Sequence, residues 1–163
     1  MLILGIDPGL GGGLAVLRGG ELVLLADMPT IWIQRPKGRR REYLVGELVE
    51  MMHSVILMRE PGEELRAIVE RQHARPGQGV SSCYSLGYGT GLVAGILATL
   101  SIPLEWAEPA AWKRAMGLPR GADKGASIEL ASRLFPTAEI GRKDGRAEAL
   151  LLAEYGRRRS AGG

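Results

Sequence analysis

Residues 2–28, LILGIDPGLGGGLAVLRGGELVLLADM, contain three short apolar runs separated by glycine-rich segments. The first run, 2–6, is closed by DPGLGGG, a composition typical of a tight turn after a buried strand. The Gly19-Gly20 pair then divides the following apolar stretch into two halves, which is a strong hairpin signal. The chain is therefore predicted to open with three antiparallel strands.

The rest of the chain alternates between helical and strand patterns. Apolar residues recur at helical spacing over 42–58, and LRAIVERQ at 65–72 has the composition of a fourth strand. Because a helix separates this strand from the hairpin, the crossover predicts that it pairs in parallel with strand 2–6. A helix, a fifth strand and three more helices are expected at 85–100, 102–108, 109–117, 124–135 and 141–156. The prediction is an α/β fold with a mixed five-stranded sheet, three antiparallel strands continued by parallel ones, flanked by helices.

Length and composition limit the class of protein. With 163 residues, a single domain over 1–163 is expected, with a disordered tail at 160–163. No apolar stretch is long enough to span a bilayer and no export signal is evident, so a cytoplasmic, intracellular protein is expected. Cys83 is the single cysteine and the two histidines, His53 and His73, are far apart, which argues against disulfides and Cys/His zinc sites. Asparagine is absent and Arg exceeds Lys, which fits a thermophilic source or a GC-rich genome.

Four acidic residues stand out once the strands are placed. Asp7 follows the first strand and Glu70 closes the fourth, so both carboxylates are expected at the same edge of the sheet. Asp144 and Glu148 are four residues apart and share one face of the last helix. If that helix crosses the same edge, four negative charges meet in a half-buried cleft, which is unfavourable without a cation. We therefore expect two Mg²⁺ ions and metal-dependent phosphodiester hydrolysis.

Most of these acids also have a simpler interpretation. Asp7 before Pro-Gly is an ordinary turn former. Glu70 could form a salt bridge with Arg71 or Arg75. Asp144 could be the N-cap of the last helix, where an acid complements the helix dipole. The fourth acid is surrounded by apolar neighbours and is the hardest to explain in this way.

Several blocks of the sequence resemble the phage-type branch of the RuvC-like Holliday-junction resolvases, which belong to the RNase H-like superfamily. These blocks are LGIDPGLGGGLAVL, AIVERQHARPGQGVSSCYSLGYGTGLVAGIL, PAAWKRAMGL, DKGASIELASRLFP and KDGRAEALLLAEYG. They run in the family's order over nearly the whole chain, with only 30–45 poorly matched. The resemblance implies an RNase H-like fold, a homodimer and nicking of two opposed strands of a four-way junction that depends on Mg²⁺ or Mn²⁺.

The resemblance also assigns roles to individual residues. Positions that match the family's catalytic, metal-binding acids are Asp7, Glu70, Asp144 and Glu148. Family lysines that would hold the scissile phosphate fall on Lys113 and Lys124, although both also fit an ordinary solvated helix face. The cellular enzymes have their last two acids three residues apart, whereas here they are four apart and position 145 is Gly.

Basic and polar residues gather in segments that could contact DNA. A junction recognised by its shape requires a broad basic face for the phosphates. Two basic runs suit this purpose, or are ordinary solvated segments: 35–41, within a polar, basic loop predicted at 32–42, and 156–160. Polar side chains after the fourth strand are expected to contact or stack on unpaired bases, although His73 could instead make a structural hydrogen bond. The predicted DNA-binding residues are Arg39, Arg40, Arg41, His73, Arg75, Gln78, Tyr84, Lys113, Lys124, Arg142, Lys143 and Arg146.

Three glycines mark a possible interface. Gly87, Gly91 and Gly95 recur every fourth residue on one helix face. Glycine weakens a helix, so such a face is expected where another backbone approaches closely. That backbone belongs either to the protein's own sheet or, as the resemblance favours, to a second copy in a two-fold dimer.

Other functions fit part of the same pattern. An actin-like ATPase or sugar kinase also has an Asp-Gly turn after its first strand, but it needs a second domain for which 163 residues are too few. A non-catalytic RNase H-like junction-binding protein and a nuclease of other branched DNA, such as forks or flaps, fit the same residues. A resolvase cleaves the junction when a metal is present, whereas the non-catalytic junction-binding protein binds it without cleavage.

Overall fold

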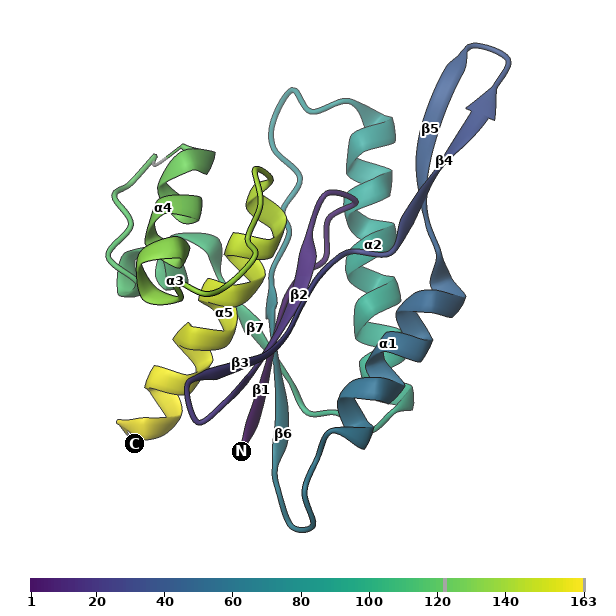
Figure 1. Cartoon of the computed structure of the whole chain (residues 1–163). Coiled ribbons are helices and arrows are strands. Elements are labelled where there is room, and N and C mark those ends of the chain that lie inside the picture. The colour runs from purple at the N-terminus through teal and green to yellow at the C-terminus, as the bar shows by residue number, and fades with distance from the viewer. Residues whose placement is uncertain (122, 163) are drawn as a thin grey trace.

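A mixed sheet of five strands lies at the centre of the protein (Figure 1). The computed structural model describes residues 1–121 and 123–162, without the side chain of Lys124. The strand order is β3-β2-β1-β6-β7, in which β1, β2 and β3 pair antiparallel and β1, β6 and β7 pair in parallel. These strands are β1 (Leu2–Asp7), β2 (Gly13–Arg18), β3 (Glu21–Asp27), β6 (Leu65–Glu70) and β7 (Leu104–Ala107). The predicted sheet and its parallel crossover are confirmed.

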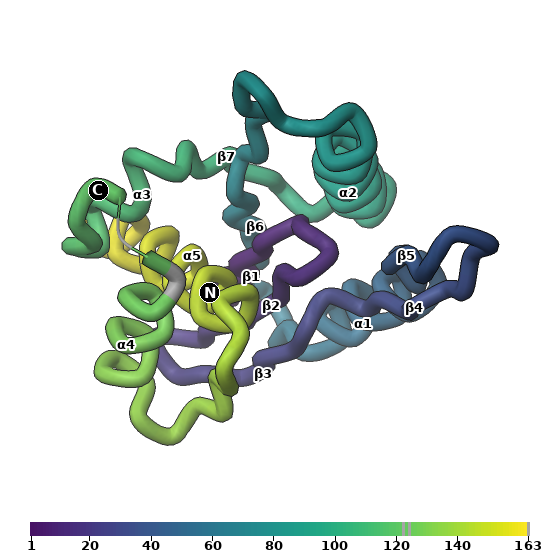
Figure 2. Tube along the Cα trace, turned by 90° about the horizontal axis from the view of Figure 1, so that it is seen from above, coloured from purple at the N-terminus to yellow at the C-terminus, as the bar shows by residue number. Residues whose placement is uncertain are grey.

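Helices cover both faces of this sheet, as the two views in Figures 1 and 2 show. On one face lie α1 (Val45–Leu57) and α2 (Val80–Thr99), and on the other α3 (Pro109–Ala115), α4 (Lys124–Leu134) and α5 (Asp144–Ala161). Successive residues of β1 serve the two faces in turn: Leu2 and Leu4 pack on the α1/α2 side and Ile3 on the α5 side. Burial on both faces explains why the strands are continuous apolar runs rather than alternating ones.

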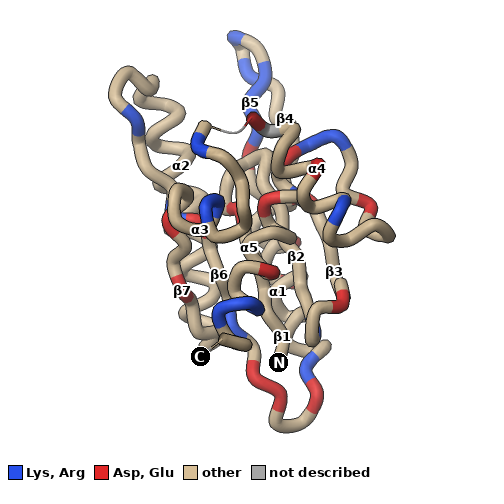
Figure 3. Tube along the Cα trace, turned by 90° about the vertical axis from the view of Figure 1, so that its left-hand side faces the viewer, with Lys and Arg blue, Asp and Glu red and all other residues tan. Residues whose placement is uncertain are grey.

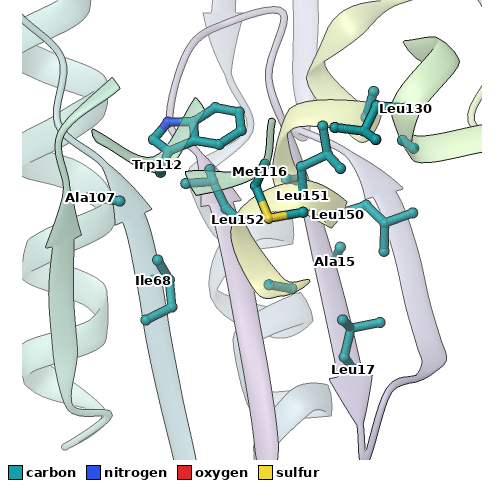
Figure 4. Close-up of a cluster of buried hydrophobic side chains, with 14 of the residues drawn as sticks. Ala15, Leu17, Ile68, Ala107, Trp112, Met116, Leu130, Leu150, Leu151 and Leu152 are labelled. Atoms are coloured by element: carbon teal, nitrogen blue, oxygen red, sulfur yellow. The ribbon is translucent and has the colours of Figure 1, made fainter. Parts of the chain in front are cut away.

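The core between the sheet and α5 fixes the position of the last helix. Leu150, Leu151 and Leu152 are fully buried there, near the indole of Trp112 (Figure 4). The helix also approaches β1 at the level of the backbone, because a Cβ on Gly5 would lie 2.1 Å from the Ala149 carbonyl oxygen. Because these contacts are so close, α5 can pack across the sheet in only one position.

The beginning of α5 is held by a second close approach. A Cβ on Gly145 would lie 2.2 Å from the carbonyl oxygen of Gly11, in the turn between β1 and β2. Only glycine leaves room for this contact, which brings the first turn of α5 to the carboxyl end of β1. The glycine that departs from the pattern of the cellular enzymes therefore has a packing reason.

The segment 30–43 is a β-hairpin, so the prediction of a polar, basic loop at 32–42 is wrong. Its strands are β4 (Thr30–Arg35) and β5 (Gly38–Tyr43), which, within the described ranges, pair only with each other. The connecting turn ends at Gly38, whose φ of 112° lies in the region that favours glycine. The arginines of β5 occupy both faces of the ribbon, which removes the apolar-polar alternation that marks a strand with a buried face.

The end of the chain also differs from the prediction. Residues 160 and 161 belong to α5 and do not form a disordered tail, and the Ser160 hydroxyl donates a hydrogen bond to the Gly156 carbonyl at 3.1 Å. Residue 163 lies outside the described residues. In the described part of the chain, no helix is long and apolar enough to cross a membrane.

Candidate active site

An open cleft of about 1020 Å³ lies at the carboxyl ends of β1 and β6. Asp7 is the last residue of β1 and Glu70 the last residue of β6, and the parallel register sets these two strand ends side by side. The first turns of α5 add Asp144 and Glu148 to the wall of the same cleft. Three elements far apart in the sequence thus bring the four predicted acids to one place.

One amide joins the two strand-end carboxylates. The Gln72 side chain donates to Glu70 Oε2 at 2.7 Å and to Asp7 Oδ1 at 3.3 Å. Asp7 Oδ1 also accepts from the backbone N–H of Gly9 at 3.1 Å, so the turn after β1 fixes this carboxylate. The simple interpretation of Asp7 as a turn former is therefore correct but incomplete.

Glu70 is held from the opposite side as well. Its carboxylate accepts from the indole N–H of Trp112 at 3.0 Å, and the residue is 6% exposed. Among the described residues, Glu70 forms neither of the alternative salt bridges, to Arg71 or to Arg75, and the guanidinium of Arg71 pairs with Glu108 at 3.3 Å instead. Two neutral donors orient Glu70 without cancelling its charge.

The acids of α5 differ in their surroundings. Glu148 is 8% exposed, and one of its oxygens lies 2.6 Å from Lys113 Nζ and 3.3 Å from the Ser127 hydroxyl. Asp144 is the first residue of the helix, and the N-cap position belongs to Lys143. The alternative of an N-cap role for Asp144 is therefore not what the structure has.

Proximity and burial change the proton affinity of the strand-end acids. Burial, followed by the charge of Glu70, raises the pKa of Asp7 from 3.8 to about 7, although the Gly9 N–H opposes the shift. Burial and the charge of Glu148 likewise raise the pKa of Glu70, against the hydrogen bond from Trp112. The raised pKa values show that the donors around Asp7 and Glu70 do not fully offset the cost of ionising these two carboxyls, and a cation beside them would favour the ionised forms.

The side chains do not converge on one ion position in this arrangement. Among the described residues, no group of three or more His, Cys, Asp or Glu side chains is placed to hold a metal ion. The Gln72 amide lies between the carboxylates of Asp7 and Glu70, and the Lys113 ammonium contacts that of Glu148. The predicted four-carboxylate metal cluster is thus not preassembled, although carboxylate oxygens are the ligands that Mg²⁺ prefers.

The polar residues after β6 line the same cleft. His73, Arg75 and Gln78 all contribute to its wall. His73 Nε2 lies 2.8 Å from a carboxylate oxygen of Glu108, which is the structural hydrogen bond left open by the sequence. Tyr84 lies outside this cleft, on α2, with 62% of its surface exposed.

The predicted basic residues are more scattered. Arg39, Arg40 and Arg41 lie on β5, in a hairpin that projects beyond the sheet (Figures 1 and 2) and carries several blue segments in Figure 3. Arg142 and Lys143 are exposed just before α5. Arg146 pairs with Asp27 at 2.9 Å. In the basic run 156–160, Arg157 and Arg158 pair with Glu154 and Arg159 pairs with Glu105. The side chain of Lys124 lies outside the described residues.

Three side chains of the site were missed in the sequence. Gln72, Trp112 and Ser127 each donate to a carboxylate in the cleft. Gln72 stands two residues after Glu70 in VERQ, and Trp112 precedes Lys113 in AWKRA. The proximity of Gln72 and Trp112 in the sequence to predicted site residues was the signal that could have indicated their role.

The chain has clear relatives among proteins of known function. It is 30% identical over 156 residues to the crossover junction endodeoxyribonuclease RuvC of Chloroflexus aggregans, covering 94% of this chain and 90% of the relative. The chain belongs to the RuvC family. The RuvC proteins of two Chloroflexus aurantiacus strains match with the same identity and coverage. No protein-family model matches the chain.

Solved RuvC structures share the fold. Thermus thermophilus RuvC in complex with Holliday junction substrate superposes with a TM-score of 0.66 at 18% identity, covering 100% of this chain and 97% of that one. A second Thermus thermophilus RuvC structure gives a TM-score of 0.59 at 19% identity, with 98% and 97% covered. The predicted family and fold are confirmed, while the assignment to the phage-type branch stays a prediction.

Proposed function

We propose that this protein is a divalent-metal-dependent endonuclease that resolves four-way DNA junctions by nicking opposed strands. One observation carries the proposal: a member of the RuvC family has four acids from β1, β6 and α5 on the wall of one cleft. The relatives it matches are named as crossover junction endodeoxyribonucleases. Other branched DNA, such as forks and flaps, is a secondary class of substrate.

The four carboxylates are the proposed ligands of the metal. When bound, two Mg²⁺ or Mn²⁺ ions would supply an activated water and charge stabilisation for the leaving oxygen. Asp7 is fixed by the Gly9 N–H and Glu70 by the Trp112 indole, so both keep their orientation when the Gln72 amide is displaced. Burial and the charge of Glu70 raise the pKa of Asp7, and a bound cation would favour the ionised form of this carboxyl.

Lys113 is proposed to hold a phosphate oxygen of the scissile strand. Its ammonium lies at the wall of the cleft, in contact with Glu148 at 2.6 Å, and 32% of its side chain is exposed. A flexible side chain with three donors can turn from this carboxylate to a phosphate without moving the backbone. Lys124 begins α4 and is proposed for the same task on the basis of the family resemblance alone.

The DNA is proposed to extend from the cleft over basic side chains on both sides of it. Arg75 lines the cleft, and Arg142 and Lys143 stand exposed before α5. On the other side the β4–β5 hairpin presents Arg39 and Arg40, both exposed. Phosphate contacts of this kind supply affinity and position rather than sequence readout.

A homodimer is the proposed form of the enzyme. Nothing within the described residues lies within 4 Å of a Cβ built on Gly87, Gly91 or Gly95. The alternative that these glycines pack on the protein's own sheet therefore fails, and Gly89 on the opposite side is the one that packs inward. An open glycine face fits a second copy, and two identical sites are needed to cut two opposed strands.

The decisive experiment compares an immobile four-way junction with a matched linear duplex. Each DNA is incubated with purified protein in Mg²⁺, Mn²⁺ or EDTA, and the cuts are mapped. We expect symmetric, metal-dependent nicks confined to the junction. Tight binding of the junction without cuts in any metal would instead favour a non-catalytic junction-binding protein.

A further inference from the structure

The β4–β5 hairpin begins at the edge of the sheet that carries the active site. In the register of the sheet, Asp7 pairs with Gly13 and Gly13 pairs with Asp27, so the last residue of β3 lies about 10 Å from that of β1 in the same row. Both strands run in the same direction, because both are antiparallel to β2. The chain therefore enters the hairpin beside the catalytic edge, and the ribbon extends away from it (Figure 1).

Two hydrogen bonds hold the base of the hairpin against the turn that follows Asp7. The backbone N–H of Met28 donates to the Gly12 carbonyl at 3.0 Å, before the first strand of the ribbon. The Tyr43 hydroxyl, at the end of the second strand, donates to the Pro8 carbonyl at 2.8 Å. Both ends of the ribbon are thus tied to the turn between β1 and β2, which fixes the direction in which the hairpin leaves the site.

One face of the ribbon is turned towards that turn. Residues that pair directly across two antiparallel strands share a face, and alternate pairs share the same face. This catalytic-side face consists of Thr30, Trp32, Gln34, Arg39, Arg41 and Tyr43. At its base, Arg41 Nη1 lies 3.9 Å from a Cβ built on Gly11, and the Tyr43 hydroxyl reaches Pro8. The face therefore continues the surface of the catalytic turn.

The charge of the hairpin is divided unequally between its two faces. Segment 30–43 contains five Lys and Arg residues and one acid, Glu42. Glu42 lies on the opposite face, where it pairs with two of the arginines. No acid among the described residues forms an ion pair with Arg39 or Arg41, so their charges suit a polyanion. A two-fold contact between copies of this face would instead bring like charges together.

Both of these cations are held in place by neighbours on the catalytic-side face. The guanidinium carbon of Arg39 lies 4.5 Å from the centroid of the Trp32 ring. Arg41 Nε donates to the Thr30 hydroxyl at 2.7 Å. Trp32 is 54% exposed, so its ring forms an open platform under the guanidinium rather than part of a core. Cations that are already oriented lose less conformational entropy when they bind a phosphate.

We propose that the catalytic-side face binds the phosphate backbone of the duplex arm that leaves the cleft, with Trp32 positioning Arg39. The inference rests on the proposed nuclease function and adds to it the way in which one arm of the substrate is held. A strand of six residues is about 20 Å long and DNA rises about 3.4 Å per base pair, so the ribbon accompanies about six base pairs. The hairpin falls in the segment that matches the resolvase pattern poorly, so this contact is not carried over from the family.

The test measures binding of the full chain, in EDTA, to a four-way junction. One phosphate at a time along each arm is replaced by a neutral methylphosphonate. Arg39→Gln and Trp32→Ala are compared with the wild type. Ile31→Ala is the matched control, because Ile31 is 47% exposed and lies beside Trp32 in the sequence but on the opposite face of the ribbon. Cleavage of the unmodified junction is measured separately in Mg²⁺.

We expect Arg39→Gln to bind the junction about tenfold more weakly in roughly 0.1 M salt, the effect of counterion release at one phosphate. Trp32→Ala should bind about two- to fivefold more weakly, the range of one exposed cation–π contact, and Ile31→Ala should bind like the wild type. Neutralising one phosphate within about six base pairs of the cut should weaken binding of the wild type. The same phosphate should matter little to Arg39→Gln, because its partner is already lost.

Two results would overturn the inference. One is that Arg39→Gln and Trp32→Ala bind like the wild type, or lose as much further affinity as the wild type at every methylphosphonate, since no phosphate then depends on them. The other is that Arg39→Gln sediments as a monomer when the wild type sediments as a dimer, because the hairpin would then contact a second copy. A wild type that binds the junction but does not cut it in Mg²⁺ would refute the proposed function and not the contact with the arm.

Discussion

Replacing Asp7 by Asn should make the metal-free protein more stable at pH 8, although it removes a catalytic group. The pKa of Asp7 is about 7 in the folded protein against 3.8 for an ordinary carboxyl, because of burial and the neighbouring acids. Ionising it in the fold costs about 4 kcal/mol at most, and about 1–3 kcal/mol after allowance for water in the open cleft. Asn removes this cost and still accepts the hydrogen bond from Gly9.

The dependence on pH gives the prediction its sign. Below pH 3.8 the carboxyl is protonated in both the folded and the unfolded chain and contributes nothing. As the pH rises towards 7 the unfolded chain releases the proton while the folded one retains it, so stability falls over this interval. The advantage of Asp7→Asn should therefore be small near pH 4 and complete at pH 8.

Thermal unfolding in EDTA at pH 4 and pH 8 measures this effect. For a chain of this size, 1–3 kcal/mol corresponds to a rise in Tm of at least about 2–4 °C at pH 8. Asp27→Asn is the matched control, since Asp27 also ends a strand but pairs with Arg146 at the surface. An Asp7→Asn protein that is no more stable than the wild type at pH 8, or equally stabilised at pH 4, would refute the reasoning. Added Mg²⁺ should reduce the difference, because it binds the folded wild type.

Three further predictions test the packing, the chemistry and the DNA contacts. Gly145→Ala should destabilise the protein and impair cleavage, because its Cβ would lie 2.2 Å from a backbone carbonyl oxygen. Gly91→Ala, on the open helix face, should instead raise the stability of the monomer by up to about 1 kcal/mol in urea unfolding. The same variant should weaken dimerisation, as measured by sedimentation. Glu148→Gln should abolish nicking while junction affinity in gel shifts stays within about twofold; a variant that still cuts would remove Glu148 from the catalytic set. Arg39→Gln should lower the slope of log affinity against log salt by about 1, and Arg66→Gln, at the opposite end of the sheet, should not.

Much of the fold was predictable because it depends on local patterns. The Gly19-Gly20 hairpin, the apolar strands and the helical periodicities were sufficient to predict a mixed five-stranded sheet, flanked by helices, in which strand 65–72 pairs in parallel with strand 2–6. The hairpin at 30–43 was missed because it has no buried face, so its strands lack the alternation from which strands are recognised. Its turn, PKG, was the remaining signal.

The candidate site divides in the same way. The sequence by itself determined that Asp7 and Glu70 end neighbouring parallel strands and that Asp144 and Glu148 share a helix face, because strand pairing and helix period follow from local pattern.

Only the tertiary structure decided which groups touch these acids. The Gln72 amide reaches Asp7 across 65 positions of sequence, and the Lys113 ammonium reaches Glu148 across 35. The first contact follows from the pairing of β1 with β6, while the second depends on how α3 and α5 pack, and the position of α5 is decided by backbone packing at Gly5 and Gly145 and by the buried core. No local pattern contains these distances, because they result from the packing of whole elements against one another.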